Sequence, residues 1–489
     1  MNDKIQKIRQ FIDKQDINVD GTISKLIKTA AAEVRGSEYI PKEESIRKGE
    51  TLREHIPLKH HGKWEVKKNR ESAISLLKEQ ESTRVQELIP LRHERMSVSP
   101  FTFYRGSAII MADDLAATPD TGLIVQAVGD AHISNFGLFA SPERRIVYDV
   151  NDFDETLPGP WEWDIKRLAA SVEICGRDRG FSKKKRQKAV FQAARAYRDA
   201  MRGFSDMGNL DVWYAHVDID DLLKSGNKNL SKNERKLIKK HTRKALSKNS
   251  ASAVEKFAEL VDGSYRIKSD PPVIVPIGEL YPKAKRDQFM KDFIGKLVTL
   301  YRLSLPRERR DLICRYKPVD AARKVVGVGS VGSKAWIVIL EGVPGGDPLV
   351  LQIKQATESV LERHLEKSRF AEHGLRVVAG QKAIQTAGDI LLGWISVPME
   401  HGVDAYYVRQ LWDGKGSVDL DKISEEGLVG IASLSAWTLA HAHAKTGDRH
   451  AIAAYLGGTD DCEKAMVKFS RAYADQNEAD YQTFLKAEK

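Results

Sequence analysis

The spacing of apolar residues along the chain changes several times between helical and strand-like patterns. Residues 1–60 are polar, with short apolar repeats that predict a helical N-terminal extension. Short apolar runs then predict three strands, within GLIVQAVGD (122–130), NFGLFA (135–140) and IVYDV (146–150). A loop rich in Pro and Gly follows them and leads into a helix that starts near Trp163.

A mostly helical middle, from about 165 to 310, precedes a second β-rich region. There KVVGVGSVGSKAWIVILEG (324–342) combines strand formers with glycines, GGDP (345–348) predicts a turn, and LVLQIK (349–354) predicts another strand. Helices are expected from about Thr357 to Phe370, from Glu425 to Lys445 and from Asp461 to Lys486, with short strands near 376–397. This pattern predicts an α+β protein.

Composition narrows the class of protein. With 42% hydrophobic and 30% charged residues, the chain can bury a core and is unlike a disordered chain. Its three cysteines lie far apart, which favours neither a disulfide framework nor a cysteine-based zinc site. No apolar run approaches the length of a membrane span and the charged N-terminus lacks an apolar signal segment, so we expect a cytoplasmic protein without a membrane partner.

The net charge of +10 comes from two short stretches. Ten Lys/Arg and one acid lie between Lys224 and Lys248, and seven Lys/Arg and one acid lie between Arg177 and Lys188, so the rest of the chain is slightly acidic. The pattern over 231–248 predicts a helix with a basic side. Through this helix the protein could bind nucleic acid or an acidic partner, although runs of charge are usually solvated surfaces.

Short polar residues are concentrated around the three predicted strands. The loop Gly129-Asp130-Ala-His132-Ile-Ser-Asn135 separates the first two, and Asp149, Asp152 and Asp154 lie at the end of the third. Phosphoryl transfer uses one carboxylate to accept or orient the proton of the nucleophile, while an amide oxygen and another carboxylate hold Mg²⁺. Two alternatives remain open. Asp and Asn favour turns for local backbone reasons, and a His beside carboxylates is typical of a transition-metal site.

A second motif, Gly327-Val-Gly329-Ser330-Val-Gly332, matches GxGxxG. A dinucleotide-binding fold needs a helix after these glycines, whereas SKAWIVILE predicts a strand. A glycine-rich connection between strands favours the kinase-type loop that covers ATP phosphates. This interpretation requires a lysine on the next strand and then a glutamate, which Lys354 and one of Glu358, Glu362 and Glu366 provide. Alternatively, Lys354 is an edge-strand charge and the glutamates form a solvated helix face.

The two motifs occur in the reverse of the usual kinase order, because the glycines follow Asp130 by about 200 residues. A competing catalytic loop around Asp448 lacks an Asn five residues further on. We therefore expect a protein-kinase-like two-lobe fold in circularly permuted order. Arg105 either contacts phosphate or pairs with a buried carboxylate. The expected parts are an N-terminal extension (1–60), the catalytic and metal-loop part of the large lobe (61–175), a helical insertion with the basic helix (176–315), a small β-rich nucleotide-binding lobe (316–400), and the hinge and C-terminal helices of the large lobe (401–489).

Several stretches in fixed order resemble a bacterial family, domain of unknown function 2252, from about Gly49 to the C-terminus. They are PFTFYRGSA, GDAHISNFG, NDFDETLPGPWEWDIKRLAAS, ARKVVGVGSVGS, LQIKQA, YYVRQLWDGKGS and YADQNEADY. Locally, GDAHISN followed by NDFDE resembles the GDxHxxN and IDFDD motifs of aminoglycoside and choline phosphotransferases. This likeness implies that Asp130 is the catalytic base, that Asn135 and Asp152 bind Mg²⁺, and that Lys354 contacts phosphate. Asp149 stays a competing metal ligand, since its distance from Asn135 is closer to the kinase spacing.

The expected function is ATP- and Mg²⁺-dependent phosphotransfer to an unidentified small-molecule or protein hydroxyl. Alternatives are nucleotidyl transfer, a nucleotide-binding pseudokinase, and a non-catalytic protein that binds nucleic acid or an acidic partner through 231–248. The oligomeric state stays open. The candidate residues are Asp130, His132 and Lys354 for catalysis, Gly327, Gly329, Ser330, Gly332, Lys354 and Glu362 for the nucleotide, and Asn135, Asp149, Asp152 and Asp154 for the metal.

Overall fold

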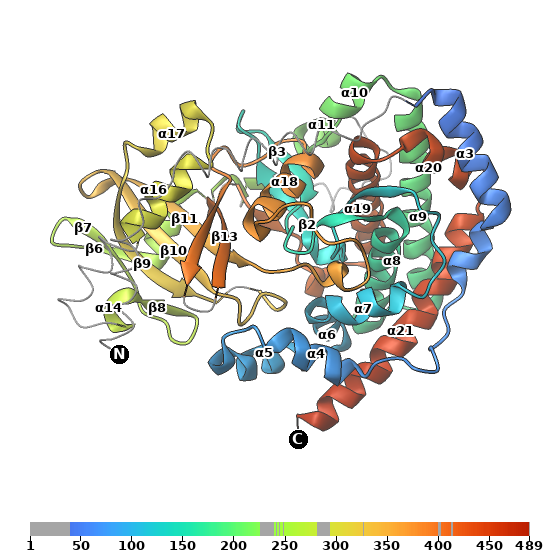
Figure 1. Ribbon diagram of the computed structural model, residues 1–489, viewed down its shortest axis with the longest axis horizontal. Coiled ribbons are helices and arrows are strands. Elements are labelled where there is room, and N and C mark those ends of the chain that lie inside the picture. Colours follow the sequence, from blue (N-terminus) through green and yellow to red (C-terminus); the bar gives the residue numbers. More distant parts are fainter. Residues whose placement is uncertain are drawn as a thin grey trace.

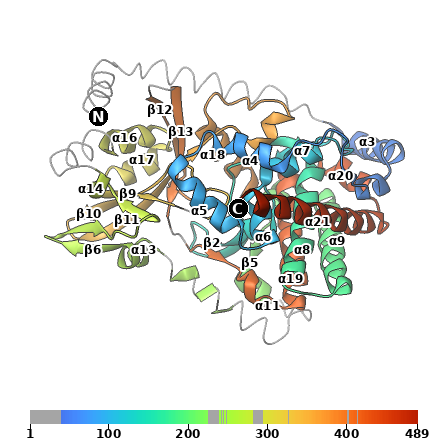
Figure 2. The same ribbon diagram turned by 90° about the horizontal axis from the view of Figure 1, so that it is seen from below.

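The computed structural model describes residues 40–224, 239–240, 242–243, 245–247, 249–280, 294–325, 327–399, 402–411 and 414–488. Figures 1 and 2 show two bodies, a helical body of long helices and a sheet body built around an antiparallel sheet. The expected α+β class is therefore confirmed. Within the described ranges, no helix combines the length and apolar character that crossing a bilayer requires.

Four long helices form the centre of the helical body: α8 (Trp161–Asp178), α9 (Lys183–Asp206), α19 (Glu425–Thr446) and α21 (Asp461–Ala487). The other three pack against α8, which is buried from Trp161 through Gly176. Because α8 is covered on all sides, its charged residues must find partners inside the protein. The helices expected near Trp163 and at the C-terminus are confirmed.

Shorter helices surround this centre, and one of them lies between the two bodies in both views, α5 (Ile89–Met96) (Figures 1 and 2). Leu88, just before α5, packs with Val325 and Val331 of the sheet body. The other short helices are α3 (Lys42–His55), η1 (Leu58–Gly62), α4 (Ala73–Glu81), η2 (Gln86–Leu88), α6 (Pro100–Gly106), α7 (Ala108–Leu115), α10 (Asn209–Tyr214), α11 (Ile219–Lys224), η6 (Leu420–Lys422) and α20 (Arg449–Leu456).

The three strands predicted around the first motif are present. They are β1 (Ile124–Ala127), β2 (Phe136–Ala140) and β3 (Ile146–Val150). β2 and β3 form an antiparallel pair between β14 (Gly416–Ser417) and β5 (Val217–Asp218), while β1 pairs with β4 (Leu157–Pro160). β4 is missing from the sequence prediction because its residues are LPGP, and Pro and Gly are typical of turns rather than strands.

The sheet body is an antiparallel sheet of order β12-β13-β11-β10-β9-β8. Along β10, Ile337 and Ile339 pack into one apolar cluster with α13 (Ser250–Phe257), while Val338 and Leu340 pack into another with α16 (Gly295–Leu303). Successive side chains of β10 point to opposite faces of the sheet, and an apolar cluster covers each face. Its strands are β8 (Ile274–Pro276), β9 (Lys317–Lys324), β10 (Ala335–Val343), β11 (Gly346–Ala356), β12 (Gly393–Met399) and β13 (Gly402–Gln410).

The prediction of a helix from Thr357 to Phe370 is wrong. Only the 3₁₀ helix η5 (Val360–Arg363) forms there, and α18 (His373–Ile384) lies where strands are expected. The Glu362 carboxylate accepts the backbone N–H of Ser359 at 2.9 Å and that of Ser368 at 3.0 Å. Local capping of this kind closes a single turn instead of extending it into a helix.

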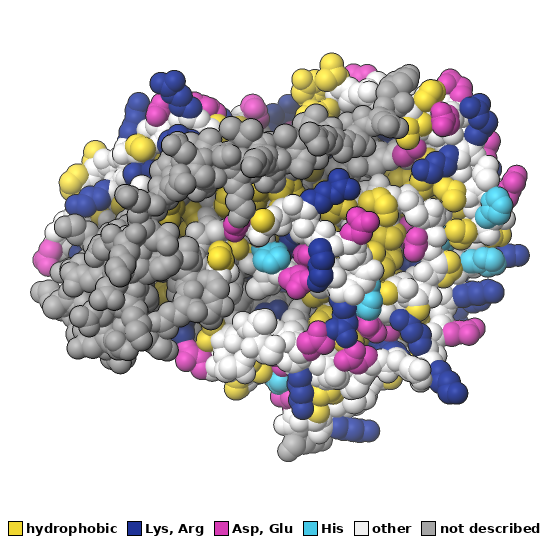
Figure 3. Space-filling model, in the orientation of Figure 1, with side chains coloured by type: hydrophobic (Ala, Val, Ile, Leu, Met, Phe, Trp, Pro, Cys, Tyr) yellow, Lys and Arg dark blue, Asp and Glu magenta, His cyan; other side chains and the backbone are white. Residues whose placement is uncertain are grey.

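The stretch 176–315, expected to be helical, also contains strands, and its β8 extends the six-stranded sheet. Its later part therefore packs with the sheet body. On the face in Figure 3, basic and acidic side chains are interspersed over the helical body. Residues 231–238, 241, 244 and 248 of the expected basic helix, and residues 1–39, lie outside the described residues. The remaining elements of this stretch are β6 (Ala258–Val261), β7 (Ser264–Ile267), α14 (Ile277–Leu280) and α17 (Arg307–Ile313).

Candidate active site

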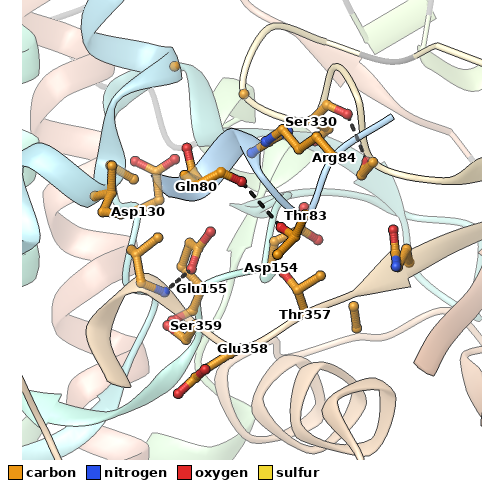
Figure 4. A pocket seen from close by; sticks show the side chains of 18 of the residues that line it. Gln80, Thr83, Arg84, Asp130, Asp154, Glu155, Ser330, Thr357, Glu358 and Ser359 are labelled. Carbon is orange, nitrogen blue, oxygen red and sulfur yellow. Dashed lines mark hydrogen bonds between the residues drawn. The ribbon is translucent and has the colours of Figure 1, made fainter. Parts of the chain in front are cut away.

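A pocket of about 490 Å³ opens between the helical body and the sheet body (Figure 4). The segment 79–84, the end of α6, the loops after β1 and β3, the connection between β9 and β10, and the chain after β11 all contribute to its wall. Candidate residues from distant parts of the sequence therefore meet in one cavity. They are Asp130, Asn135, Asp152, Asp154, Gly329 and Ser330.

A carboxylate of α8 fixes the loop before Asp130. Asp164 Oδ2 accepts the N–H of Val128 at 2.7 Å, and its Oδ1 accepts that of Gly129 at 3.0 Å. His443 Nε2, from α19, lies 3.1 Å from Asp164 Oδ2. Since Asp164 is almost completely buried, these contacts hold the backbone of the loop against the central helices.

The loop that carries Asp130 approaches the loop after β3 so closely that only glycine fits at position 129. Its φ is +83°, and a Cβ atom there would lie 2.3 Å from the carbonyl oxygen of Glu155. Glu155 lines the pocket and accepts the N–H of Val360 at 2.7 Å. Burial raises the pKa of Glu155 to about 7. The loop that carries Asp130 and the loop that carries the other aspartates are therefore in direct contact.

Asp130, the candidate base, is held by an arginine of α8. Arg167 Nε donates to Asp130 Oδ1 at 2.8 Å, and Arg167 Nη2 donates to the carbonyl of Tyr104 at 2.8 Å. The guanidinium also lies over the Tyr104 ring, 3.8 Å from its centroid. One carboxylate oxygen is thus engaged, while Asp130 still contributes to the pocket wall.

His132 does not line the pocket. Its side chain is buried, with Nε2 3.6 Å from Asp130 Oδ2, and burial lowers the pKa of His132 to about 4. The ring is therefore neutral at neutral pH. In this arrangement His132 packs against Asp130 and does not face a substrate in the pocket.

Lys354 of β11 lies against carboxylates of the other body. Its Nζ forms an ion pair with Asp154 Oδ2 and lies 3.7 Å from Asp152 Oδ1. Tyr407 donates its hydroxyl to Asp154 Oδ1 at 2.9 Å. Burial opposes the charge of Lys354, but the two carboxylates outweigh it and raise its pKa. Lys354 and Asp154, 200 residues apart in the sequence, thus belong to one charged cluster.

The expected partner of Lys354 is wrong. The lysine contacts Asp154 and Asp152, whereas the Glu362 carboxylate caps backbone N–H groups and Glu358 pairs with Lys367. The expectation of a glutamate relied on a helix after β11, and that helix does not form. Residues of the loop after β3 take the place of the glutamate.

Asn135 and Asp152 have the donor atoms that a magnesium ion requires. Asn135 donates its Nδ2 to the Asp130 carbonyl at 2.8 Å, which leaves its amide oxygen as an acceptor. Asp152 Oδ1 is buried without a hydrogen-bond partner among the described residues. Burial alone would raise the pKa of Asp152, but Lys354 and Arg409 keep it below its usual value. An ionised carboxylate oxygen and an amide oxygen in the wall of one pocket suit Mg²⁺, which takes few protein ligands and completes its shell with phosphate and water.

Asp149 does not belong to this site. Its carboxylate accepts the N–H groups of Val150 and Thr386, and it is absent from the pocket wall. Burial raises the pKa of Asp149 to about 6. Of these two candidate metal ligands, only Asp152 lines the pocket. In the described parts of the chain, no group of three or more His, Cys, Asp and Glu is arranged to hold a metal.

The glycine-rich segment 327–333 connects antiparallel strands β9 and β10, as the sequence predicts. Gly329 and Ser330 line the pocket, but Gly327 and Gly332 do not. Gly327 and Gly332 have φ values of +65° and +89°, in the region that favours glycine. Backbone conformation therefore accounts for these two glycines, which are not in contact with the cavity.

A family model described as an uncharacterized protein conserved in bacteria, DUF2252, matches residues 84–487. The chain belongs to this family. No curated protein and no solved structure matches it. In this DUF2252 protein the candidate residues from Asp130 to Lys354 all lie inside the matched region, whereas Gln80 and Thr83 of the pocket wall precede it.

Three contributors to the DUF2252 site were missed in the sequence. Glu155 directly follows Asp154, and its place in the same motif was a usable signal. Arg167 lies on a helix with charges at several positions, so only the burial of α8 reveals that it needs an internal partner. Tyr407 lies on β13, and its contact with Asp154 depends on how the sheet meets the helical body.

Proposed function

We propose that this DUF2252 protein is an ATP- and Mg²⁺-dependent phosphotransferase that acts on a small-molecule or protein hydroxyl. The observation that carries the proposal is that Lys354 contacts Asp154 and Asp152, two residues in the wall of a pocket that Asp130 and Asn135 also line. A carboxylate, an amide and a second carboxylate around one cavity, with a lysine paired to its wall, are the groups that phosphoryl transfer uses. A protein that only binds a macromolecule has no need for this set.

In the proposed reaction each group has one role. Asn135 and Asp152 would hold Mg²⁺, which would neutralise charge on the phosphates. Lys354 contacts the phosphates, and Tyr407 and Asp154 keep its side chain in place. Asp130 orients the acceptor hydroxyl and takes its proton. Asp164 positions Asp130 through the backbone of Val128 and Gly129.

The proposal includes a kinase-like two-lobe architecture in permuted order. In it, the sheet body is the small lobe and the helical body is the large lobe. The glycine-rich segment and Lys354 then follow the catalytic loop in the sequence and close over it in space. A pocket lined by both bodies supports this arrangement.

A nucleotide-binding protein without transfer is the second candidate. The ion pair between Arg167 and Asp130 favours it, because the guanidinium occupies one of the carboxylate oxygens that could bind an acceptor hydroxyl. Product formation from labelled ATP, with wild type and Arg167→Gln, separates the two candidates. Transfer by the wild type excludes the second one.

Calorimetry of ATP binding with and without Mg²⁺ tests the proposed function. We expect Mg²⁺-dependent binding in wild type that Asp152→Ala abolishes. Asp149→Asn is the matched control, since Asp149 lies in the same sequence cluster but outside the pocket. Absence of nucleotide binding in a folded wild-type protein would overturn the proposal.

A further inference from the structure

Residues 84–95 of the helical body hold the glycine-rich segment by its carbonyl oxygens. Four hydrogen bonds from residues 84–95 engage carbonyl groups of this segment. No described residue accepts the N–H of Gly329 or Ser330. Two backbone donors thus remain on residues that line the pocket. The bonds are those from Arg84 Nη1 to the Val331 carbonyl at 2.6 Å, from Arg92 Nη1 to that of Gly329 at 2.7 Å, from Arg95 Nη1 to that of Gly327, and from the Val85 N–H to that of Gly332 at 2.8 Å.

Two arginines in the pocket wall have no carboxylate partner. Arg363 and Lys367, also in the wall, are each paired with glutamates. Among the described residues, neither Arg84 nor Arg105 forms an ion pair, and Arg105 Nε is buried without any hydrogen-bond partner. A half-buried guanidinium left in this state lacks the anion that would compensate its desolvation. The alternative that Arg105 pairs with a buried carboxylate is therefore wrong for the described structure.

Both arginines adjoin the glycine-rich segment. A Cβ at Gly332 would lie 3.0 Å from Arg84 Cβ, and one at Gly329 would lie 3.1 Å from the carbonyl oxygen of Arg105. Figure 4 shows Arg84 beside Ser330, on the side of the pocket away from Glu358. Burial lowers the pKa of Arg84 although nearby carboxylates act in the opposite direction. An anion bound in the pocket would stabilise the positive charge of Arg84 and offset the effect of burial.

We propose that Arg84 and Arg105 form a phosphate clamp that contacts the terminal phosphates of the nucleotide together with the N–H groups of Gly329 and Ser330. The inference rests on the proposed function and specifies its substrate as an oligophosphate-bearing nucleotide. Guanidinium groups suit this task, because they bind phosphate through two parallel hydrogen bonds.

The clamp has a role in the transfer step itself. The bond from the terminal phosphorus to the diphosphate leaving group breaks while a bond to the acceptor oxygen forms, and the acceptor proton passes to Asp130. Negative charge develops on the leaving diphosphate. Arg84 and Arg105 lie beside the glycine-rich segment, and their positive charge stabilises the leaving diphosphate.

Calorimetry with ATP, adenosine and inorganic tripolyphosphate tests the clamp. We expect Arg84→Ala and Arg105→Ala each to weaken ATP and tripolyphosphate binding by roughly tenfold or more, and adenosine binding by less than about twofold. The matched control is Arg95→Ala, because Arg95 also binds the glycine-rich segment but does not line the pocket. It should leave the ratio of ATP to adenosine affinity unchanged.

The outcomes separate the clamp from the proposed function. Equal weakening of ATP and adenosine in the Arg84 and Arg105 variants, or the same change of ratio in Arg95→Ala, overturns the clamp. Arginine-dependent tripolyphosphate binding without Mg²⁺-dependent ATP binding overturns the proposed function and leaves the clamp standing. Thermal denaturation monitors folding, and Arg84→Lys replaces Arg84→Ala in the same comparison if the alanine variant does not fold.

Discussion

Substitution of Asp164 tests whether this buried carboxylate anchors the loop that precedes Asp130. Asp164 is 1% exposed and accepts the N–H groups of Val128 and Gly129. A hydrogen bond to a charged group contributes about 1.5–3 kcal/mol, and a buried donor left unpaired costs about 1–3 kcal/mol. Asp164→Ala leaves two such donors, so we expect the free energy of unfolding to fall by about 4 kcal/mol. Asp164→Asn keeps one oxygen but turns an NH₂ group toward the second donor, and we expect a fall of about 3 kcal/mol.

Urea denaturation at pH 7, followed by circular dichroism, measures these changes. The control is Asp178→Asn at the exposed C-terminal end of the same helix, where a carboxylate is unfavourable to the helix dipole. We expect the control to change the free energy of unfolding by no more than about 0.5 kcal/mol. A loss below about 1 kcal/mol for Asp164→Ala would refute the anchoring role.

Three further predictions concern pH, backbone conformation and the central ion pair. The pKa of His132 is about 4 in the folded protein and 6.5 in the unfolded chain, so the unfolded chain binds a proton more readily. The free energy of unfolding is therefore highest above pH 6.5 and falls as the pH decreases toward 4. Between pH 7 and 4, wild type should lose about 3 kcal/mol more than His132→Gln in denaturant titrations, and parallel curves would contradict this. Gly129→Ala adds a steric clash to an unfavourable φ and should cost about 3 kcal/mol, against about 1 kcal/mol for Gly180→Ala, where φ is +69° and no atom lies within 4 Å. Lys354→Met should cost about 2 kcal/mol, less than a fully buried pair because the Asp154 side chain is 28% exposed, and Asp154→Asn should recover part of that loss in the double variant. Equal losses in the single and double Lys354 variants would show that the two charges are not coupled.

Local patterns in the sequence predict a large part of the fold. The strand IVYDV is found at the predicted residues, and the glycine-rich segment connects two antiparallel strands. In each case the signal is the alternation of apolar residues over a few positions, which depends on neighbours in the chain. The prediction of a helix after Lys354 is wrong because apolar spacing does not reveal side-chain capping. Glu362 accepts the N–H groups of Ser359 and Ser368 there, and only a single turn forms.

The site could be predicted only in part. Asp130, Asn135 and Asp152 come together because they belong to two loops next to paired strands, which short-range reasoning can locate. The choice between Asp152 and Asp149 depends on which way each side chain faces, because the spacing from Asn135 favoured Asp149 whereas the NDFDE motif favoured Asp152. Contacts across 200 or more residues, such as those of Arg84, depend on how two bodies pack and leave no periodic signal in the sequence.

The ion pair between Lys354 and Asp154 has a consequence for how the protein is made. A ribosome adds about 5–20 residues per second, so about 10–40 s pass between synthesis of the acidic loop and arrival of its lysine. During that interval the aspartates have no opposite charge to accompany them into a buried position. The loop therefore stays hydrated until β11 is available, and the pocket forms late, after most of the sheet has left the ribosome. Because α19 and α21 follow β11 in the sequence, the centre of the helical body is also completed only after the lysine has been made.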